Sequence, residues 1–275
     1  LFNLPDEDVD VTFDNGDVYG GYVGMGDYTK QSVGSASSNE VTISGNSEIK
    51  GSVFGGKTNS GSADYNVVKI TGGSVDGDVY GGDARKSGSN NSVSITNASI
   101  GESVYGGYGS GSASNNTVNI TGASIDGSVY GGEAGKGASS KNIVTITDST
   151  VKEVITGGYS DYSNVTSNEV KISGGNITYV VGGNAEWGNV IGNSVEISND
   201  ANIVQVYGGI TYYDDDRPSG NVINNTVTIN SGTIGEAVYG GFAYAGSVEN
   251  NIVNWKGGNI TGGLYGGFVQ SSDIY

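Results

Sequence analysis

A short unit recurs through almost the whole chain and constrains its fold more than any other feature. A Gly-Gly pair preceded by two mostly apolar or aromatic residues occurs ten times, as in the Val-Tyr-Gly-Gly segment at residues 79–82. Successive pairs lie 25 or 26 residues apart in seven of nine intervals, and the other two intervals are 35 and 32 residues. A regular period of this length is typical of folds in which each repeat stacks on its neighbours.

A second motif, Asn-x-Val-x-Ile, keeps a fixed register with the Gly pairs. Val and Ile at alternate positions predict a short β-strand, and no segment shows the sustained 3.6-residue period of a helix. A leucine-rich repeat would be dominated by Leu, which is rare here, and a propeller blade needs about 40 residues and four strands. We therefore predict an all-β fold, a parallel β-helix (β-solenoid) of about nine to ten coils of 25–26 residues, with residues 1–275 as one repeat domain.

The Asn of this motif shares a strand face with the Val and Ile, so it is predicted to point inward. A buried amide costs free energy unless it is hydrogen-bonded. Stacked coils place the same Asn about 4.8 Å above and below, which allows a continuous amide ladder. The predicted ladder residues are Asn39, Asn66, Asn91, Asn116, Asn142, Asn168, Asn193, Asn225 and Asn251.

The aromatic residue before most Gly pairs is predicted to point outward, because the residue before it shares the inward face. This alternation would stack aromatic rings along one outer face, with interruptions at Thr156 and Val181. The predicted members are Phe54, Tyr80, Tyr105 and Tyr130, followed further along by Tyr207, Tyr239 and Tyr265. Such a strip would either cover the solenoid surface or contact a glycan or protein.

Length variation is concentrated at one corner of the predicted coil, between each Gly pair and the next ladder Asn. Eight or nine residues lie there in seven of nine cases, but residues 22–38 and 210–224 form longer segments of 17 and 15 residues. We predict that both are protruding loops, where solenoids tolerate insertions and carry function. The candidate contact residues are Met25 and Tyr28 in the first loop, and Tyr212, Tyr213, Asp214, Asp215, Asp216 and Arg217 in the second.

The composition excludes several classes of function. With no Cys and no His, thiol nucleophiles, His bases and the usual zinc sites are absent. The net charge of −17 argues against nucleic acid and against anionic lipid as partners. No apolar run is long enough for a membrane-spanning helix, and we expect no direct membrane insertion. Asp214–Asp216 lack the alternating ligands of a calcium loop, so neither a metal nor a cofactor is expected.

The tandem Asn-x-Val-x-Ile…Val-Tyr-Gly-Gly units resemble the β-helical passenger domains of bacterial autotransporters and related surface adhesins. The resemblance covers about residues 9 to 270. It implies a right-handed coil, display on the bacterial cell surface or secretion, and attachment to a host or bacterial surface protein or glycan. The family's membrane barrel and signal sequence are not part of the printed sequence. We expect this chain to be a fragment of a longer protein that continues beyond Tyr275.

Three classes of function therefore compete. The first is a non-enzymatic adhesin or adhesin stalk that makes contact through the corner loops. The second is a polysaccharide-binding or polysaccharide-degrading β-helix, but Asp76 and Asp126 occupy equivalent positions in units that are separated by a unit with Gly101 there, so no carboxylate cluster emerges. The third is a self-associating structural fibre. We expect the first, and no enzymatic activity.

Overall fold

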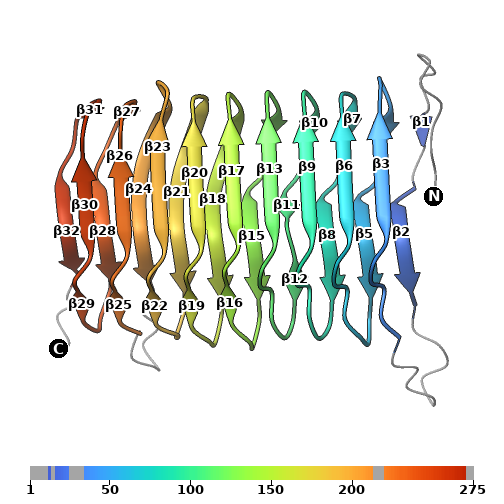
Figure 1. Ribbon diagram of the computed structural model, residues 1–275, viewed down its shortest axis with the longest axis horizontal. Helices are drawn as coiled ribbons and strands as arrows, with labels where there is room; N and C mark the ends of the chain where they lie inside the picture. Colours follow the sequence, from blue (N-terminus) through green and yellow to red (C-terminus); the bar gives the residue numbers. More distant parts are fainter. Residues whose placement is uncertain (1–11, 14–15, 25–33, 213–219, 271–275) are drawn as a thin grey trace.

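The computed structural model shows a straight rod of stacked coils (Figure 1). The structure describes residues 12–13, 16–24, 34–212 and 220–270. Over these residues all paired strands are parallel and lie in sheets of eighteen, nine and five strands, and no helix is present. The predicted parallel β-solenoid is therefore confirmed, with about nine coils as counted by the nine-stranded sheet.

The nine-stranded sheet is built from the Asn-x-Val-x-Ile motifs. Each strand begins directly after the ladder Asn, and the motif residues pair in register from coil to coil, as Val118 does with Val93 and Val144. The Val and Ile side chains face inward, because the strand alternates buried and exposed positions. Its members are β3 (Glu40–Ser44), β6 (Val67–Thr71), β9 (Ser92–Thr96), β13 (Thr117–Thr121), β17 (Ile143–Thr147), β20 (Glu169–Ser173), β23 (Ser194–Ser198), β26 (Thr226–Ile229) and β30 (Ile252–Trp255).

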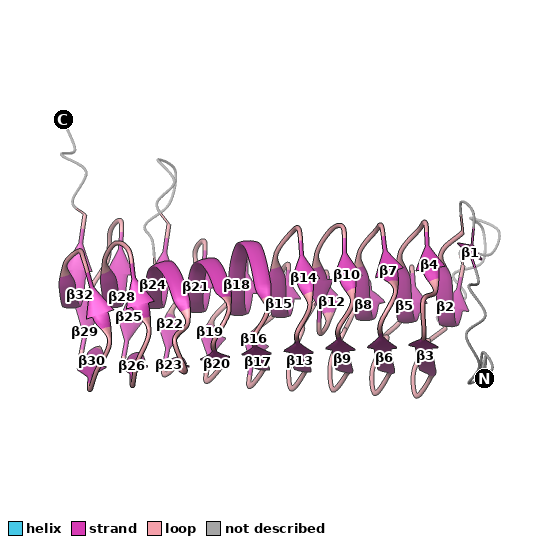
Figure 2. Ribbon diagram, turned by 90° about the horizontal axis from the view of Figure 1, so that it is seen from above, coloured by secondary structure: helices cyan, strands magenta, loops and turns pink. Residues whose placement is uncertain are grey.

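The eighteen-stranded sheet lies along the other side of the rod (Figure 2) and contains the Gly pairs. In most coils it has two segments per turn, separated by a short Gly-containing stretch. The shorter segments are β1 (Thr12–Phe13), β4 (Glu48–Ile49), β7 (Ser74–Val75), β10 (Ser99–Ile100), β14 (Ser124–Ile125), β27 (Thr233–Ile234) and β31 (Asn259–Ile260). The segments around the Gly pairs are β2 (Val18–Val23), β5 (Val53–Thr58), β8 (Val79–Ala84), β11 (Val104–Tyr105), β12 (Tyr108–Gly109), β15 (Val129–Ala134), β28 (Val238–Ala243) and β32 (Leu264–Val269).

Three consecutive coils differ, because their two segments merge into one long strand. These strands are β18 (Thr150–Ser160), β21 (Asn176–Ala185) and β24 (Asn202–Thr211). The other coils carry a Gly between the two segments, as at Gly127, whereas these three have Lys152-Glu153-Val154, Thr178-Tyr179 and Val204-Gln205 in that place. Without the Gly the backbone stays extended, since Gly weakens a strand interior.

The five-stranded sheet forms the third side, beside the corner where loop length varies. It consists of β16 (Ser139–Ser140), β19 (Val165–Thr166), β22 (Val190–Ile191), β25 (Val222–Ile223) and β29 (Val248–Glu249). A small apolar cluster of Val165, Ala185, Val190, Val222 and Ala243 packs beneath it.

The main core fills the space between the two larger sheets with Val and Ile. Burial depends on a neighbouring coil on each side, as the final described coil shows. Ile229 and Val238 are fully buried, whereas the residues paired with them in the next coil, Trp255 and Leu264, are 54% and 46% exposed. Stacking is therefore the source of the core, as expected for a solenoid.

The predicted Asn ladder is confirmed and runs without a break through all nine residues. In each of the eight steps, the backbone N–H and the side-chain Nδ2 of one Asn both donate to Oδ1 of the Asn in the following coil, at 2.8–3.2 Å. In the seven ladder residues from Asn91 to Asn251, Nδ2 also donates to a backbone carbonyl of the preceding coil, as from Asn116 to Gly88. Each buried amide is thereby satisfied.

The Gly pairs are explained by the space that the ladder occupies. A Cβ at Gly132 would lie 2.6 Å from Nδ2 of Asn142, and a Cβ at Gly131 would lie 2.9 Å from Asn142 Cβ. Both positions therefore face the ladder, and no larger residue fits between the strand and the amide column.

The residue directly before each ladder Asn adopts a left-handed backbone conformation, which the sequence analysis did not anticipate. The φ angles are between 54° and 62° at these positions: Ser38, Tyr65, Asn90, Asn115, Lys141, Ser167, Asn224 and Asn250. Gly192 occupies the remaining position with a φ of 65°. Asn and Gly tolerate this conformation best, which explains why four of these nine residues are Asn.

Candidate binding face

Most of the predicted loop contact residues cannot be placed. Tyr212 is described, but Met25, Tyr28, Tyr213, Asp214, Asp215, Asp216 and Arg217 lie outside the described residues. Their role in binding stays a prediction. Tyr212 directly follows β24, is 42% exposed, and stacks on the ring of Tyr244 with the ring centroids 5.6 Å apart.

Strands extend into both segments that the sequence analysis assigned to loops. β2 continues to Val23 and β24 to Thr211, and β25 begins at Val222. In the second segment the described residues therefore end at Tyr212, directly after β24, and resume at Gly220.

The predicted stack of aromatic rings is confirmed, and we call it the tyrosine column. Consecutive rings from Phe54 to Tyr130 are nearly parallel, with centroids 4.7–5.2 Å apart, and Thr156 and Val181 interrupt the column as expected. The stack resumes through Tyr207, Tyr239 and Tyr265. Tyr19 adds one ring at the N-terminal side, which the Val-Tyr-Gly-Gly segment at residues 18–21 could have predicted.

A second column of side chains lies beside the tyrosine column, three residues later in each coil, and we call it the outer column. Most of its aromatic members pack edge-on against the tyrosine rings, as Tyr108 does on Tyr80 and Tyr105. Its members are Tyr22, Lys57, Asp83, Tyr108, Glu133, Tyr159, Asn184, Ile210, Phe242 and Phe268.

The sequence analysis did not identify the outer column, because it treated everything after the Gly pair as loop. The strand continues instead to a buried Ala, as at Ala84, Ala134, Ala185 and Ala243. The recurring Gly-Gly-x-Ala pattern was the available signal, since it keeps the period of two beyond the glycines.

The outer column changes character along the rod. Toward the C-terminus Ile210 and Phe242 pack with Val181 in an apolar cluster on the outside of the sheet. Toward the N-terminus the column carries charge: Lys57 forms an ion pair with Asp83 at 3.3 Å, and its ammonium lies 3.8 Å from the centroid of the Phe54 ring. One side of the rod thus presents an apolar end and a charged end on the same framework.

Glu133 is the most perturbed carboxylate of this face. Burial, with a smaller contribution from Asp161, raises its pKa to about 7. In the described part of the chain it has neither an ion-pair partner nor a hydrogen-bond donor on its carboxylate. The phenols of Tyr105, Tyr108 and Tyr130 have raised pKa values, first because of burial and next because of the Glu133 charge. Tyr108 is also the register partner of Glu133 in the preceding coil, and Tyr130 lies on the same strand as Glu133.

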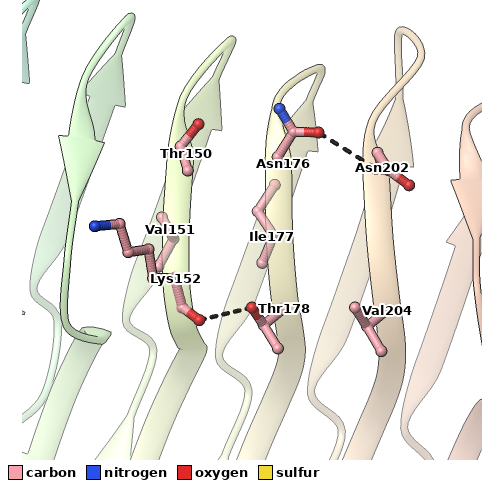
Figure 3. A pocket seen from close by; sticks show the side chains of 8 residues that line it. All are labelled: Thr150, Val151, Lys152, Asn176, Ile177, Thr178, Asn202 and Val204. Atoms are coloured by element: carbon pink, nitrogen blue, oxygen red, sulfur yellow. Dashed lines mark hydrogen bonds between the residues drawn. The ribbon is translucent and has the colours of Figure 1, made fainter.

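A shallow groove crosses the three long strands on a different part of the rod. Its volume is about 290 Å³. Figure 3 shows two rows of side chains across it, one of Thr150, Asn176 and Asn202 and the other of Lys152, Thr178 and Val204, with Val151 and Ile177 also lining it.

The groove has hydrogen-bonding groups but no acid–base constellation. Asn202 donates to Asn176 at 3.3 Å, and Thr178 donates to the backbone carbonyl of Lys152 at 2.6 Å. The Lys152 ammonium is engaged by Asp126 at 2.7 Å. The lining side chains offer hydrogen-bond donors and acceptors to a ligand.

No group of three or more Asp or Glu side chains is arranged to hold a metal ion within the ranges described above. Nor does that part of the chain hold a helix that could cross a membrane.

Comparison with protein-family models, with curated protein sequences and with solved structures found no match. The fold assignment therefore rests on the strand pairing and the ladder described above.

Proposed function

We propose that this chain is a non-enzymatic adhesin or adhesin-stalk segment, displayed on a bacterial surface or secreted. In this proposal the solenoid is a rigid spacer, and its variable corner and adjoining aromatic face contact a host or bacterial surface protein or glycan. Self-association of the rods is a further mode of contact that the same surface allows.

One observation carries the proposal: the ladder bonds are unchanged across the interval that contains the long segment 210–224. Asn193 and Asn225 are 32 residues apart, yet they make the same two ladder bonds at 2.9 Å as Asn residues 25 apart. The scaffold therefore accepts large changes at this corner without loss of core contacts, as expected where a rigid fold presents a contact loop.

A loop exchange tests the proposal. Residues 210–224 are replaced by the nine residues 184–192 of the preceding coil, and binding of the purified chain to epithelial cells and bacteria is measured. We expect binding to fall at least tenfold, with an unchanged β-rich circular dichroism spectrum. The matched control replaces residues 184–192 by residues 159–167, which alters the same corner without changing its length, and should bind normally.

The outcomes separate two roles. Full binding by the loop-exchange variant would remove this loop from the proposal. If neither the parent chain nor the variants bind any cell while remaining folded, the adhesive role fails for this segment and the stalk role alone remains.

Polysaccharide binding is the second candidate, and the groove across β18, β21 and β24 favours it. Thr150, Asn176 and Asn202 offer donors and acceptors in one row, at about the 4.8 Å spacing of adjacent strands. Titration with a panel of soluble polysaccharides, with Asn176→Leu as the test variant and the distant Asn119→Leu as its control, distinguishes this candidate. Binding unaffected by Asn176→Leu would reject the groove as the site.

A further inference from the structure

The N-terminal part of the outer column contains one complete charge arrangement and one incomplete copy of it. In the complete arrangement Lys57 and Asp83 are register partners in adjacent coils and form an ion pair at 3.3 Å. The Lys57 ammonium also lies 3.8 Å from the centroid of the Phe54 ring. A cation thus sits between a carboxylate and an aromatic ring, where both interactions favour it.

Two coils further along, the same positions hold Tyr105, Tyr108 and Glu133. Tyr105 occupies the position of Phe54 in the tyrosine column, and Tyr108 and Glu133 are register partners as Lys57 and Asp83 are. The ring and the carboxylate are both retained, but the lysine is replaced by Tyr108. Among the described residues, no cation takes the place of that lysine at Glu133.

The surroundings of Glu133 favour a cation from outside the chain. Tyr108 and Tyr159 are its register partners on the two sides, and the Tyr130 ring lies on its own strand. Asp161 lies close enough to raise the pKa of Glu133, and Glu186 accepts a hydrogen bond from the Tyr159 hydroxyl at 2.8 Å. The chain as a whole carries a net charge of −17, so a basic partner is complementary to it.

We propose that Glu133, with Tyr105, Tyr108 and Tyr159 around it, is a binding site for the ammonium group of a lysine side chain on a partner protein. The partner's lysine would form with Glu133 the ion pair that Lys57 forms with Asp83 within the chain. The site lies on the strand face and not in the loop of residues 210–224. The inference rests on the proposed function for a partner protein at the aromatic face, and it names the group that this face binds.

The test uses the whole chain with glutamate labelled at the side-chain carboxyl carbon. A Gly-Ser peptide with one central lysine is titrated in, and the Glu133 signal, identified by its loss in Glu133→Gln, is followed by NMR. We expect a saturable shift of that signal. Acetylation of the peptide lysine should weaken binding at least tenfold, because it removes the charge and keeps most of the side chain.

Variants separate this site from general attraction to an acidic protein. Glu133→Gln should weaken binding, followed at the Tyr ring signals, at least tenfold. Glu102→Gln removes the same charge from an exposed turn and should change it less than twofold. Tyr108→Leu, which leaves the carboxylate in place, should weaken binding severalfold through loss of the ring.

Three results would overturn the proposal: no shift of the Glu133 signal at any lysine-peptide concentration, equal losses in Glu133→Gln and Glu102→Gln, or equal binding of the acetylated peptide. Preference for an arginine peptide over the lysine peptide would likewise reject lysine as the ligand. Circular dichroism of each variant checks folding, and Gln is close in shape to protonated Glu. Because no cells are used, failure here leaves the adhesion test unaffected, and the reverse also holds.

Discussion

The inside and the outside of the same coils follow different rules. The Asn ladder repeats one residue nine times without exception, whereas the tyrosine column changes to Thr156 and Val181 in two coils. The outer column, on the same strands, ranges from Lys57 through Glu133 to Phe242. Both regions have the same strand spacing and register, so the difference lies in what each position must satisfy.

An inward Asn such as Asn116 takes part in five hydrogen bonds through its backbone N–H and its side-chain amide. Gln has the same amide group but is one methylene longer, so it cannot place that group at the same point of the column. An outward residue must only cover the strand and tolerate its neighbours. The fold therefore determines the inward residues, and only the outward residues can vary to suit a binding partner.

The largest effect is expected from removal of one ladder amide. Asn116→Ala deletes the acceptor for two donors of Asn91. It also removes the Nδ2 donor to the Gly88 carbonyl and one of the two donors to Asn142 Oδ1, which keeps the backbone N–H of residue 116. We expect the free energy of unfolding to fall by about 3–5 kcal/mol, because buried groups lose their partners. Asn119→Ala, three residues away on the exposed face, should change it by less than about 0.5 kcal/mol. Similar effects of the two substitutions in urea unfolding would contradict the ladder's role.

A smaller loss is expected when one ring is removed from the tyrosine column. Tyr105 stacks on Tyr80 at 4.7 Å and on Tyr130 at 5.2 Å, so Tyr105→Ala should lower the free energy of unfolding by about 2 kcal/mol. Tyr179 is 41% exposed and has no stacked ring among the described residues, so Tyr179→Ala should cost about half as much or less. Thermal unfolding measures both, and equal losses would show that stacking adds nothing beyond burial.

The outward residue Glu133 should make the stability of the chain depend on pH. The raised pKa of about 7, against 4.5 for an ordinary Glu, means that the folded chain holds a proton there that the unfolded chain releases. This group therefore lowers stability as pH rises from about 4.5 to 7, and the loss is complete above that window. Glu133→Gln should raise the free energy of unfolding at pH 8 by about 1–2 kcal/mol and change it little at pH 4. The unfolding temperature at each pH measures this difference. An equal change at both pH values would refute the carboxylate as its cause.

The smallest effect concerns the turn before the ladder. Tyr65 holds a φ of 60° with its side chain 63% exposed, so it has the strain of a left-handed residue without the packing to offset it. Tyr65→Asn should raise stability by about 0.5–1 kcal/mol. The reverse type of change, Asn90→Ala at an equivalent turn with a φ of 58°, should lower it. A loss of stability in Tyr65→Asn would show that the tyrosine makes a compensating contact.

Strict periodicity explains what could be predicted from the sequence. Asn116 and Tyr105 were placed correctly because a period of two fixes the face of every residue once one Val is known to be inside. The pairing of Lys57 with Asp83, and the absence of such a partner at Glu133 among the described residues, needed the structure, because these residues follow the Gly pair, where a loop was expected. The outer column was missed because glycines carry no side chain to reveal the continuing alternation.

The ladder also gives the rod a direction. Every Asn-to-Asn bond is donated toward the following coil, from Asn39 to Asn66 at one side through to Asn225 and Asn251 at the other. Sixteen aligned dipoles of this kind reinforce one another along the axis, much as peptide dipoles do in a helix. Two such rods can extend each other's ladder only when they meet head to tail, since head-to-head contact would oppose donors to donors.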